Sequence, residues 1–421
     1  MDKMADVLGR AGAWCGQNKY LSAIKNAFQN FMPLTIAGAI GVLWCNVLVN
    51  DQTGLGLFFK PIMALDFLNP AFQAVNFCTI SCITVGITLG IAQEIGVWNM
   101  GAERAGYIPG LVGLAAWLSV TNTSHMVEGA KDAFTGIAGN ELGATGLFTG
   151  MIIGVLSVEL FCFFEKQDAL KIKMPEQVPP GVARAFEVLV PATITLIITA
   201  CIGSACYNLT GLYLNDVIKN GIQGPLGAVG ATIPGVMIIY LVIMLFWLVG
   251  IHGNNMLSAV KEALFTPLAL ENVEAFNKGE TPKNIINMYF LQMCGEFGGS
   301  GVTIGLVIAI MIFGKREDNK AIASLSLVPG LFNINETVTF GIPMVLNPIL
   351  GIPFVVAPLV TIIIGYVLTV IGFCPVACLT VPWTTPPIVF GFLACGANVM
   401  GAVTQAILIV VSTVIYVPFL I

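Results

Sequence analysis

The stretch "LVPGLFNINETVTFGIPMVLNP", residues 327–348, decides how the chain is interpreted. It contains Glu336, and from Ala321 to Ile421 the sequence has no other Asp, Glu, Lys, Arg or His. An ionised side chain in the middle of a membrane costs roughly 2.5–3.5 kcal/mol on insertion scales, so it usually marks a transport pathway or a binding site. A carboxylate that only stabilises the end of a re-entrant helix is the structural alternative. We interpret Glu336 as functional.

The composition places this stretch in a membrane protein. Of 421 residues, 57% are hydrophobic and 10% are charged, whereas soluble proteins are about 25% charged. The apolar segments are apolar throughout and do not alternate, which favours helices over an outer-membrane barrel. The sequence therefore predicts an all-α polytopic membrane protein.

Long apolar segments give the candidate spans, since a transmembrane helix needs about 20 mostly apolar residues. The candidates are 31–49, 67–92, 143–164, 187–209, 227–250, 352–372 and 398–421, with shorter ones at 106–120 and 296–313. The first 30 residues predict one or two amphipathic helices at the inner membrane interface, because their apolar residues share a helix face.

Two segments, 321–350 and 374–396, are too interrupted by proline and glycine to be simple spans. Pro343 and Pro348 are among the interruptions of the first. Non-helical backbone at membrane depth persists only where protein or a water-filled cavity satisfies its polar groups. Both segments therefore predict re-entrant hairpins that line a solute site, as in transporters.

Basic residues predict the topology. They are Lys3, Arg10, Lys19, Lys25, Arg104, Lys166, Lys171, Lys173 and Arg184, and they gather before the first span and after alternate ones. This pattern predicts a cytoplasmic N-terminus. The cluster "GKREDNK" also looks cytoplasmic, which conflicts with a simple span count and leaves the topology across 253–350 open. A change in composition divides the chain into 1–210, an amphipathic connector at 211–225, and 226–421.

His252 is the second isolated ionisable residue. It lies in "WLVGIHGNNMLSAV", residues 247–260, inside an otherwise uncharged run. Imidazole titrates near neutral pH and can donate or accept a proton. A neutral histidine hydrogen-bonded to a backbone carbonyl is the alternative. The neighbouring Asn254 and Asn255 add hydrogen-bonding groups, as Asn335 does beside Glu336.

Three weaker candidates complete the predicted site. Trp383 and Thr384 lie in "VPWTTPP", where an aromatic ring beside hydroxyls could stack on a sugar face; an interfacial tryptophan is the alternative. Asn140 lies in "AGNELGATGLF", and an external loop explains it equally well.

Other chemistries find little support. None of the eleven cysteines forms a C-x-x-C pair, and most lie in apolar runs, so we interpret them as buried hydrophobic residues and neither disulfides nor metal ligands. The sequence has no P-loop and no H-E-x-x-H motif. We predict no cofactor, no metal site and no nucleic-acid partner.

Four sequence motifs resemble those of a known protein family. "GIHGNN" followed by "GLFNINETVTFGIPMVLNP", together with "FMPLTIAGAIGVL" (31–43) and "VPWTTPP", resembles the membrane-embedded IIC component of bacterial phosphoenolpyruvate-dependent sugar phosphotransferase systems. The branch that transports lactose, cellobiose and N,N'-diacetylchitobiose fits best, and the diacetylchitobiose transporters fit best within it. The resemblance covers essentially the whole chain. Thr337 departs from it, because the family usually has proline there.

The resemblance implies about ten transmembrane helices, of about 20 residues each, plus re-entrant hairpins. It implies a multi-pass protein of the bacterial cytoplasmic membrane that forms a homodimer through residues 1–210 and binds a disaccharide within 226–421. The sugar's 6-hydroxyl receives phosphate from a phosphocysteine on a separate IIB protein, which IIA recharges.

The resemblance also assigns roles to the candidate residues. Glu336 and His252 would lie at the accepting hydroxyl, where a carboxylate can orient the nucleophile. The expected sugar-binding residues are Glu336, His252, Asn335, Asn254, Asn255, Trp383, Thr384 and Asn140. Because the phosphoryl-carrying residues belong to other proteins, the chain would not complete the reaction alone.

A proton-coupled sugar symporter is the alternative function, with Glu336 and His252 as its proton relay. The two are distinguished by the product, which is a phosphorylated sugar in one case and a free sugar in the other. The residues leave open which disaccharide is transported and whether Glu336 or His252 accepts the proton. An intramembrane hydrolase is disfavoured, because no convincing nucleophile and base stand together.

Overall fold

The computed structural model describes residues 2–51, 55–125, 134–175, 177–342, 344–345, 347 and 349–420. The regular structure of these residues is helical except for one antiparallel pair, β1 (Ser124–His125) and β2 (Phe134–Thr135). The predicted all-α class is therefore confirmed. Pro343 and Pro348, two of the predicted interruptions, lie outside the described residues.

Among the described residues, five helices are long and apolar enough to cross a membrane. They are α2 (Lys19–Leu43) extended by η1 (Trp44–Leu48), α8 (Ala144–Glu165), α9 (Pro180–Thr210), α19 (Gly351–Val370), and α21 (Val399–Tyr416) extended by η7 (Val417–Phe419). Two further stretches qualify only when two helical parts are joined: Lys60–Ser81 with α4 (Ile83–Met100), and Leu214–Gly230 with α12 (Ile233–Leu248). All seven of the longer predicted spans thus have helical counterparts.

The described residues form further helical elements. The joined stretches contain η3 (Lys60–Leu68), α3 (Asn69–Asn76), η4 (Phe77–Ser81), α10 (Leu214–Ile218), η6 (Lys219–Gln223) and α11 (Gly224–Gly230). The others are η2 (Leu55–Leu57), α5 (Ala102–Ala105), α6 (Ile108–Val120), α7 (Gly139–Leu142), η5 (Asp168–Leu170), α13 (Gly253–Met256), α14 (Ser258–Asn277), α15 (Met288–Gly295), α16 (Ile304–Phe313), α17 (Glu317–Leu331), α18 (Glu336–Gly341) and α20 (Val389–Ala394). The total of about ten spans, of about 20 residues each, stays a prediction.

The N-terminal region only partly matches the predicted amphipathic helices. α1 (Asp2–Gln17) is a separate helix, but the residues from Lys19 to Asn30 open the long helix α2 and continue into the first span. The side chain of Asn18 sets this boundary, because its Oδ1 accepts from the backbone N–H groups of Tyr20 and Leu21, both at 3.1 Å.

The chain divides into two compact units. Unit 1 comprises Met1–Gly16, Ile36–Asn76 and Gly227–Ile421, and unit 2 comprises Gln17–Thr35 and Phe77–Leu226. The predicted division of the chain at 211–225 stays a prediction. Unit 2 ends at Leu226, and residues 36–76 pack with the C-terminal part. Within unit 1, for example, Asn46 Nδ2 donates to Asn277 Oδ1 at 3.0 Å. Composition does not reveal such long-range packing, and the functions of the predicted halves stay predictions.

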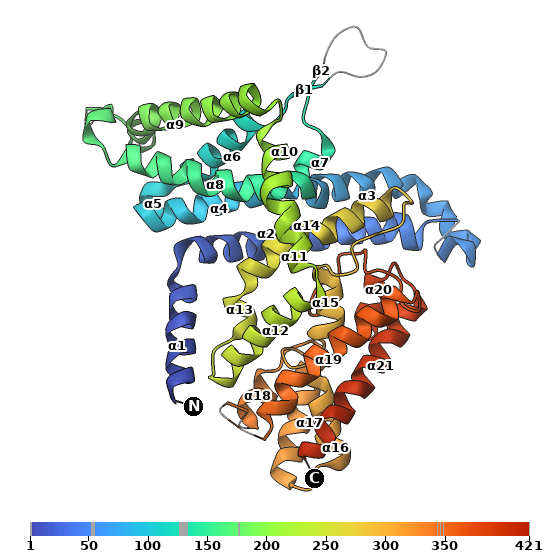
Figure 1. Ribbon diagram of the computed structural model, residues 1–421. Coiled ribbons are helices and arrows are strands. Elements are labelled where there is room, and N and C mark those ends of the chain that lie inside the picture. Colours follow the sequence, from blue (N-terminus) through green and yellow to red (C-terminus); the bar gives the residue numbers. More distant parts are fainter. Residues whose placement is uncertain are drawn as a thin grey trace. The chain divides into compact units, whose positions relative to one another are not determined.

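Close helix packing builds unit 2. Figure 1 shows α4, α6 and α8 beside one another, with α9 against α6 and α8. Small residues allow this approach: a Cβ at Gly113 would lie 2.3 Å from Ala92 Cβ, and one at Gly150 would lie 2.2 Å from Thr88 Oγ1. Membrane helices commonly pack through such residues, because lipid provides no hydrophobic drive for their association.

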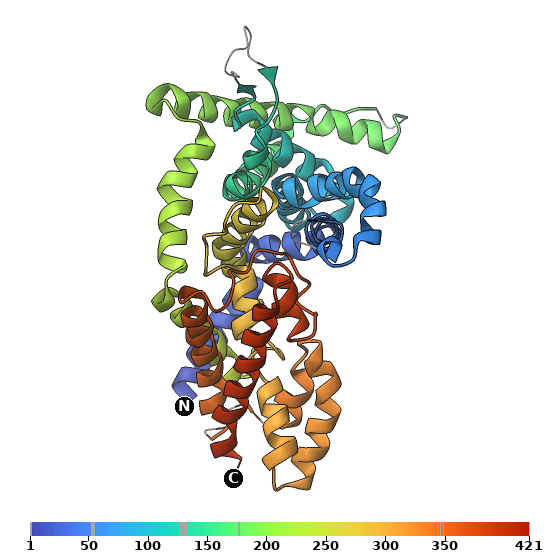
Figure 2. The same cartoon turned by 90° about the vertical axis from the view of Figure 1, so that its right-hand side faces the viewer.

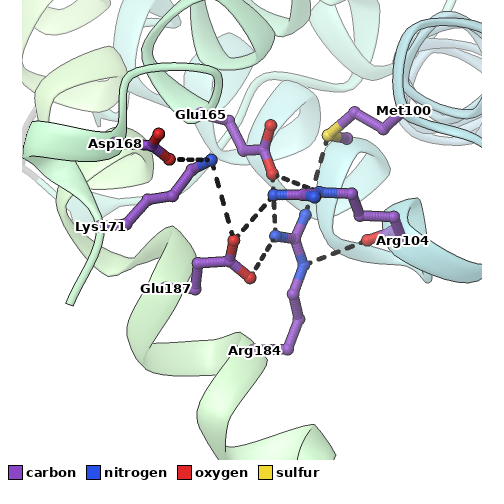
Figure 3. A network of polar contacts seen from close by, with 7 residues as sticks. All are labelled: Met100, Arg104, Glu165, Asp168, Lys171, Arg184 and Glu187. Atoms are coloured by element: carbon purple, nitrogen blue, oxygen red, sulfur yellow. Dashed lines mark hydrogen bonds and ion pairs between the residues drawn. The ribbon is translucent and has the colours of Figure 1, made fainter. Parts of the chain in front are cut away.

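An ion-pair network joins several chain segments of unit 2. It contains Met100, Arg104, Glu165, Asp168, Lys171, Arg184 and Glu187 (Figure 3). Glu165, with a side chain only 3% exposed, accepts from Arg104 Nε at 2.9 Å and Arg184 Nη1 at 2.8 Å. A buried carboxylate requires such partners. Arg104, Lys171 and Arg184, three of the basic residues that predict the topology, thus pair with carboxylates in one network. The cytoplasmic orientation of the N-terminus stays a prediction.

Unit 1 is built around α19 and α21. α19 packs against α12, α15 and α21, and α16 packs against α17 and α21; Figure 2 shows α16 and α17 as an antiparallel pair. The predicted short span 296–313 is wrong in its first part, because residues 296–303 form a loop and only Ile304–Phe313 is helical.

The two segments predicted to be broken are broken. In the first, α17 ends at Leu331 and α18 starts at Glu336, with a turn between them. In the second, residues 371–388 contain no helix, and the six-residue helix α20 follows. Both breaks lie in unit 1, where they bring non-helical backbone to the site described next.

Candidate functional site

His252 and Glu336, the two isolated ionisable residues, lie side by side in unit 1. His252 Nε2 and Glu336 Oε1 are 3.7 Å apart, and the side chains are 36% and 47% exposed. This distance is too long for a direct hydrogen bond, and both side chains remain accessible. A hydroxyl group or a water molecule can therefore contact both.

The ring orientation of His252 is fixed from two sides. His252 caps α13, and its Nδ1 accepts from the backbone N–H of Asn255 at 3.2 Å. The ring also packs against the buried Trp247, with ring centroids 4.4 Å apart. Because Nδ1 accepts, the neutral ring carries its proton on Nε2, the atom nearest Glu336. This arrangement differs from the alternative in which the ring donates to a backbone carbonyl.

A loop that the sequence analysis missed supports both residues. We call Glu296–Thr303, "EFGGSGVT", the glycine loop. Gly298, Gly299 and Gly301 have φ of 72°, 89° and 81°, a backbone conformation that favours glycine. A Cβ at Gly299 would lie 2.7 Å from both Cβ and Cγ of Asn335. The glycines therefore end the helix and leave space for the side chain of Asn335 to pack against the loop. Their clustering around Glu296 is the sequence signal that points to a loop.

Ser300, in the middle of the glycine loop, contacts two predicted site residues. Asn254 Nδ2 donates to Ser300 Oγ at 3.0 Å, and Asn335 Nδ2 donates to the Ser300 carbonyl at 2.9 Å. Asn335 is 3% exposed and also donates to Thr339 Oγ1. Asn254 Oδ1 is buried and has no hydrogen-bond partner among the described residues. The glycine loop thus holds the side chains of two residues that are close in sequence to His252 and Glu336.

Asn333 connects the segment that carries Trp383 to the glycine loop. Its Nδ2 donates to the carbonyls of Trp383 at 2.5 Å and Thr385 at 3.0 Å, and its Oδ1 accepts from Gly298 N–H at 2.6 Å. The Trp383 side chain is 44% exposed, and Thr384 is half-buried. Segments 252–255, 296–303, 333–336 and 383–385 therefore converge.

Two other predicted site residues, Asn255 and Asn140, have exposed side chains. Asn255 is exposed, and its backbone N–H rather than its side chain bonds to His252. Asn140 lies exposed in α7 of unit 2, so it belongs to a different unit from the converging segments. A role for either side chain in sugar binding stays a prediction.

A buried charged pair lies at the start of the glycine loop. Lys261 Nζ donates to Glu296 Oε1, and the hydroxyl of Tyr240 donates to the same oxygen at 2.7 Å. Lys261 is 6% exposed and Tyr240 is fully buried. This pair was not predicted, because both residues lie in 253–350, where the topology stayed open, and Glu296 is the first residue of the predicted span 296–313. Buried charges are tolerated when they are paired and hydrogen-bonded in this way.

The fold and site together define a class of protein. A carboxylate, an imidazole and carboxamides gather where the helices of an apolar chain are broken. Membrane transporters typically build solute sites in this way, because broken helices present free polar groups to a cavity. The site belongs to a solute transporter.

Comparison with known proteins makes the class specific. The family model described as "Phosphotransferase system, EIIC" matches residues 25–358, and the chain belongs to this family. It is accordingly a multi-pass sugar permease of the inner membrane that works with IIB and IIA phosphotransferase proteins. The resemblance seen in the sequence is confirmed at the level of the family.

Individual relatives cover nearly the whole chain. The oligo-beta-mannoside-specific EIIC component of Bacillus subtilis (strain 168) is 33% identical over 100% of this chain and 93% of its own length. The cellobiose-specific EIIC component of Lactococcus lactis subsp. lactis (strain IL1403) is 31% identical, over 99% of this chain and 96% of its own. The crystal structure of ChbC, the IIC component of the N,N'-diacetylchitobiose-specific system, superimposes with a TM-score of 0.88 at 30% identity, covering 97% of this chain and 94% of that one.

The glycine loop gives a direct prediction. In Gly299→Ala the new Cβ meets the held side chain of Asn335 and lies 2.9 Å from the Asn333 carbonyl, so we expect a loss of sugar binding together with a lower melting temperature. Gly279→Ala is the matched control, because Gly279 also has positive φ, 71°, but open space around its Cβ position.

The control should show only the backbone cost of a left-handed alanine, roughly 1–2 kcal/mol. Sugar affinity and thermal unfolding of both variants in detergent provide the measurement. Equal behaviour of the two would show that Asn335 does not need the close approach of the loop.

Proposed function

We propose that this chain binds an extracellular disaccharide, moves it across the inner membrane, and presents its 6-hydroxyl to the phosphocysteine of a separate IIB protein. The observation that carries the proposal is the 3.7 Å approach of His252 and Glu336, two accessible ionisable groups from long uncharged runs. Family membership supplies the phosphoryl-transfer setting.

The chemistry follows from the two side chains. The sugar oxygen attacks phosphorus, its bond to phosphorus forms, and the sulfur–phosphorus bond of the IIB phosphocysteine breaks. The proton of the hydroxyl must leave to a base within hydrogen-bonding distance. Since His252 carries its proton on Nε2 when Nδ1 accepts from Asn255, the free lone pairs are those of Glu336. We therefore assign proton acceptance to Glu336 and orientation of the hydroxyl to His252.

The substrate is inferred from relatives and from one side chain. The relatives named above bear the names oligo-beta-mannoside, cellobiose and N,N'-diacetylchitobiose. The exposed indole of Trp383 offers an apolar face for a pyranose ring. We propose N,N'-diacetylchitobiose as the substrate, with cellobiose as the next candidate. Binding measurements with diacetylchitobiose, cellobiose and lactose rank the three directly.

Residues before about 210 are proposed to form a homodimer, as the resemblance implies. Single cysteines introduced on the spans of this region should crosslink one copy to another. A purified protein that stays monomeric at every concentration in detergent contradicts the dimer.

The product of transport tests the function. Membrane vesicles containing the chain should accumulate phosphorylated disaccharide only when matching IIB and IIA proteins and phosphoenolpyruvate are supplied, because the chain depends on their phosphoryl-carrying residues. Accumulation of free disaccharide, driven by a pH gradient without these partners, would instead establish the proton-coupled symporter.

Glu336→Gln tests the site. The variant keeps the side-chain shape but removes the charge and the basic oxygen, so we expect phosphorylation to be abolished. Sugar binding should weaken by about 1.5–3 kcal/mol, the worth of a hydrogen bond to a charged group. His252→Ala should also impair phosphorylation, with a variable effect on affinity. Sugar binding and IIB-dependent phosphorylation are measured on the same preparations.

Glu280→Gln is the matched control, because Glu280 is an exposed carboxylate in the loop between α14 and α15. It should leave both activities unchanged. A Glu336→Gln protein that phosphorylates sugar at the wild-type rate would show that the carboxylate is structural.

A further inference from the structure

We propose that Ser300 is a positioning residue for phosphoryl transfer: it bonds Asn254 beside His252 and Asn335 beside Glu336, and so fixes the two ionisable side chains relative to each other. The proposal rests on the function proposed above and adds a residue that neither the sequence motifs nor the family resemblance indicates.

The first support is the pair of bonds at one residue. Ser300 is 3% exposed, its Oγ accepts from Asn254 Nδ2 at 3.0 Å, and its carbonyl accepts from Asn335 Nδ2 at 2.9 Å. Asn254 follows His252 by two residues in α13, and Asn335 directly precedes Glu336. A displacement of Ser300 therefore reaches both functional side chains through one short connection each.

The second support is that the glycine loop is itself held in place. Glu296, its first residue, is bound by Lys261 and by the Tyr240 hydroxyl. Further along, the Gly301 carbonyl accepts from the hydroxyl of Tyr416 at 2.7 Å, and Tyr416 is fully buried. A loop bonded to α12, α14 and α21 is a fixed support on which the short elements α13 and α18 can be aligned.

The third support concerns the direction of one amide. Because Asn254 Nδ2 donates to Ser300 Oγ, the opposite atom, Oδ1, points elsewhere, and it has no partner among the described residues. In this arrangement the bond to the serine hydroxyl uses Nδ2 and leaves the Oδ1 end of the amide available. Phosphoryl transfer depends mostly on positioning, and a misplacement of about 1 Å can lower a rate by 10²-fold.

Ser300→Ala is the direct test, assayed with IIB and IIA proteins and phosphoenolpyruvate. It removes the acceptor for Asn254 but keeps the carbonyl that holds Asn335. We expect kcat to fall by about tenfold or more while the dissociation constant of the sugar changes by less than about threefold, since binding tolerates small misplacements better than transfer does. Ser300→Cys keeps the size of the side chain and offers a weaker acceptor, so its kcat should lie between those of the wild type and Ser300→Ala. This variant provides the test if Ser300→Ala does not fold.

A double variant separates positioning from a general structural effect. If Ser300 acts through Asn254, then Ser300→Ala combined with Asn254→Ala should have a kcat no lower than Asn254→Ala alone, because both changes break the same bond. Ser326→Ala is the matched control: Ser326 is 1% exposed, and its hydroxyl donates to Ile322 O of its own helix at 2.7 Å. It should leave kcat unchanged.

Three results overturn the proposal. The first is a Ser300→Ala protein whose kcat is within twofold of the wild-type value. The second is a double variant in which the kcat losses of the two single variants simply add. The third is a kcat loss in Ser326→Ala equal to that in Ser300→Ala. These outcomes require a wild type that phosphorylates sugar, and they leave the proposed function intact. A wild type that produces no phosphorylated sugar with its partners overturns the function and, with it, the role of Ser300.

Discussion

The cost of placing polar and charged groups in an apolar chain is the constraint on which this structure depends. Two pairs of ionisable groups in unit 1 show how this cost is met. Lys261 is paired with Glu296 beneath the Tyr240 hydroxyl, while Glu336 and His252 keep accessible side chains beside each other. The charges of the first pair neutralise each other. We propose that the second pair acts on a bound hydroxyl.

The same constraint governs the backbone. A broken helix leaves unpaired N–H and C=O groups, which must find partners away from water. In unit 1 asparagine side chains supply many of them: Asn333 binds the carbonyls of Trp383 and Thr385, and Asn335 binds that of Ser300. Residues that stabilise the broken segments therefore also surround the candidate site.

The sequence predicted what depends on local pattern. Hydrophobic length gave the seven longer spans, proline and glycine gave the two broken segments, and isolation in uncharged runs singled out Glu336 and His252. The glycine loop was missed, because the apolar residues of 296–313 favoured a span over the signal of the glycines that cluster around Glu296. The sequence also could not show that residues 36–76 pack with the C-terminal part, since such contacts join residues as distant as Asn46 and Asn277. It also did not indicate that the Nδ2 atoms of Asn254 and Asn335 bind Ser300; their role as sugar ligands stays a prediction.

The central claim is that Glu336 contacts the hydroxyl that receives phosphate. A thermodynamic cycle between protein and ligand tests it most directly: the affinities of the disaccharide and of its 6-deoxy analogue are measured for the wild type and for Glu336→Gln. If the contact exists, removing the hydroxyl should weaken binding to the wild type by about 1.5–3 kcal/mol and binding to the variant by much less. An equal loss in both proteins would contradict the account, because it would place the 6-hydroxyl away from Glu336.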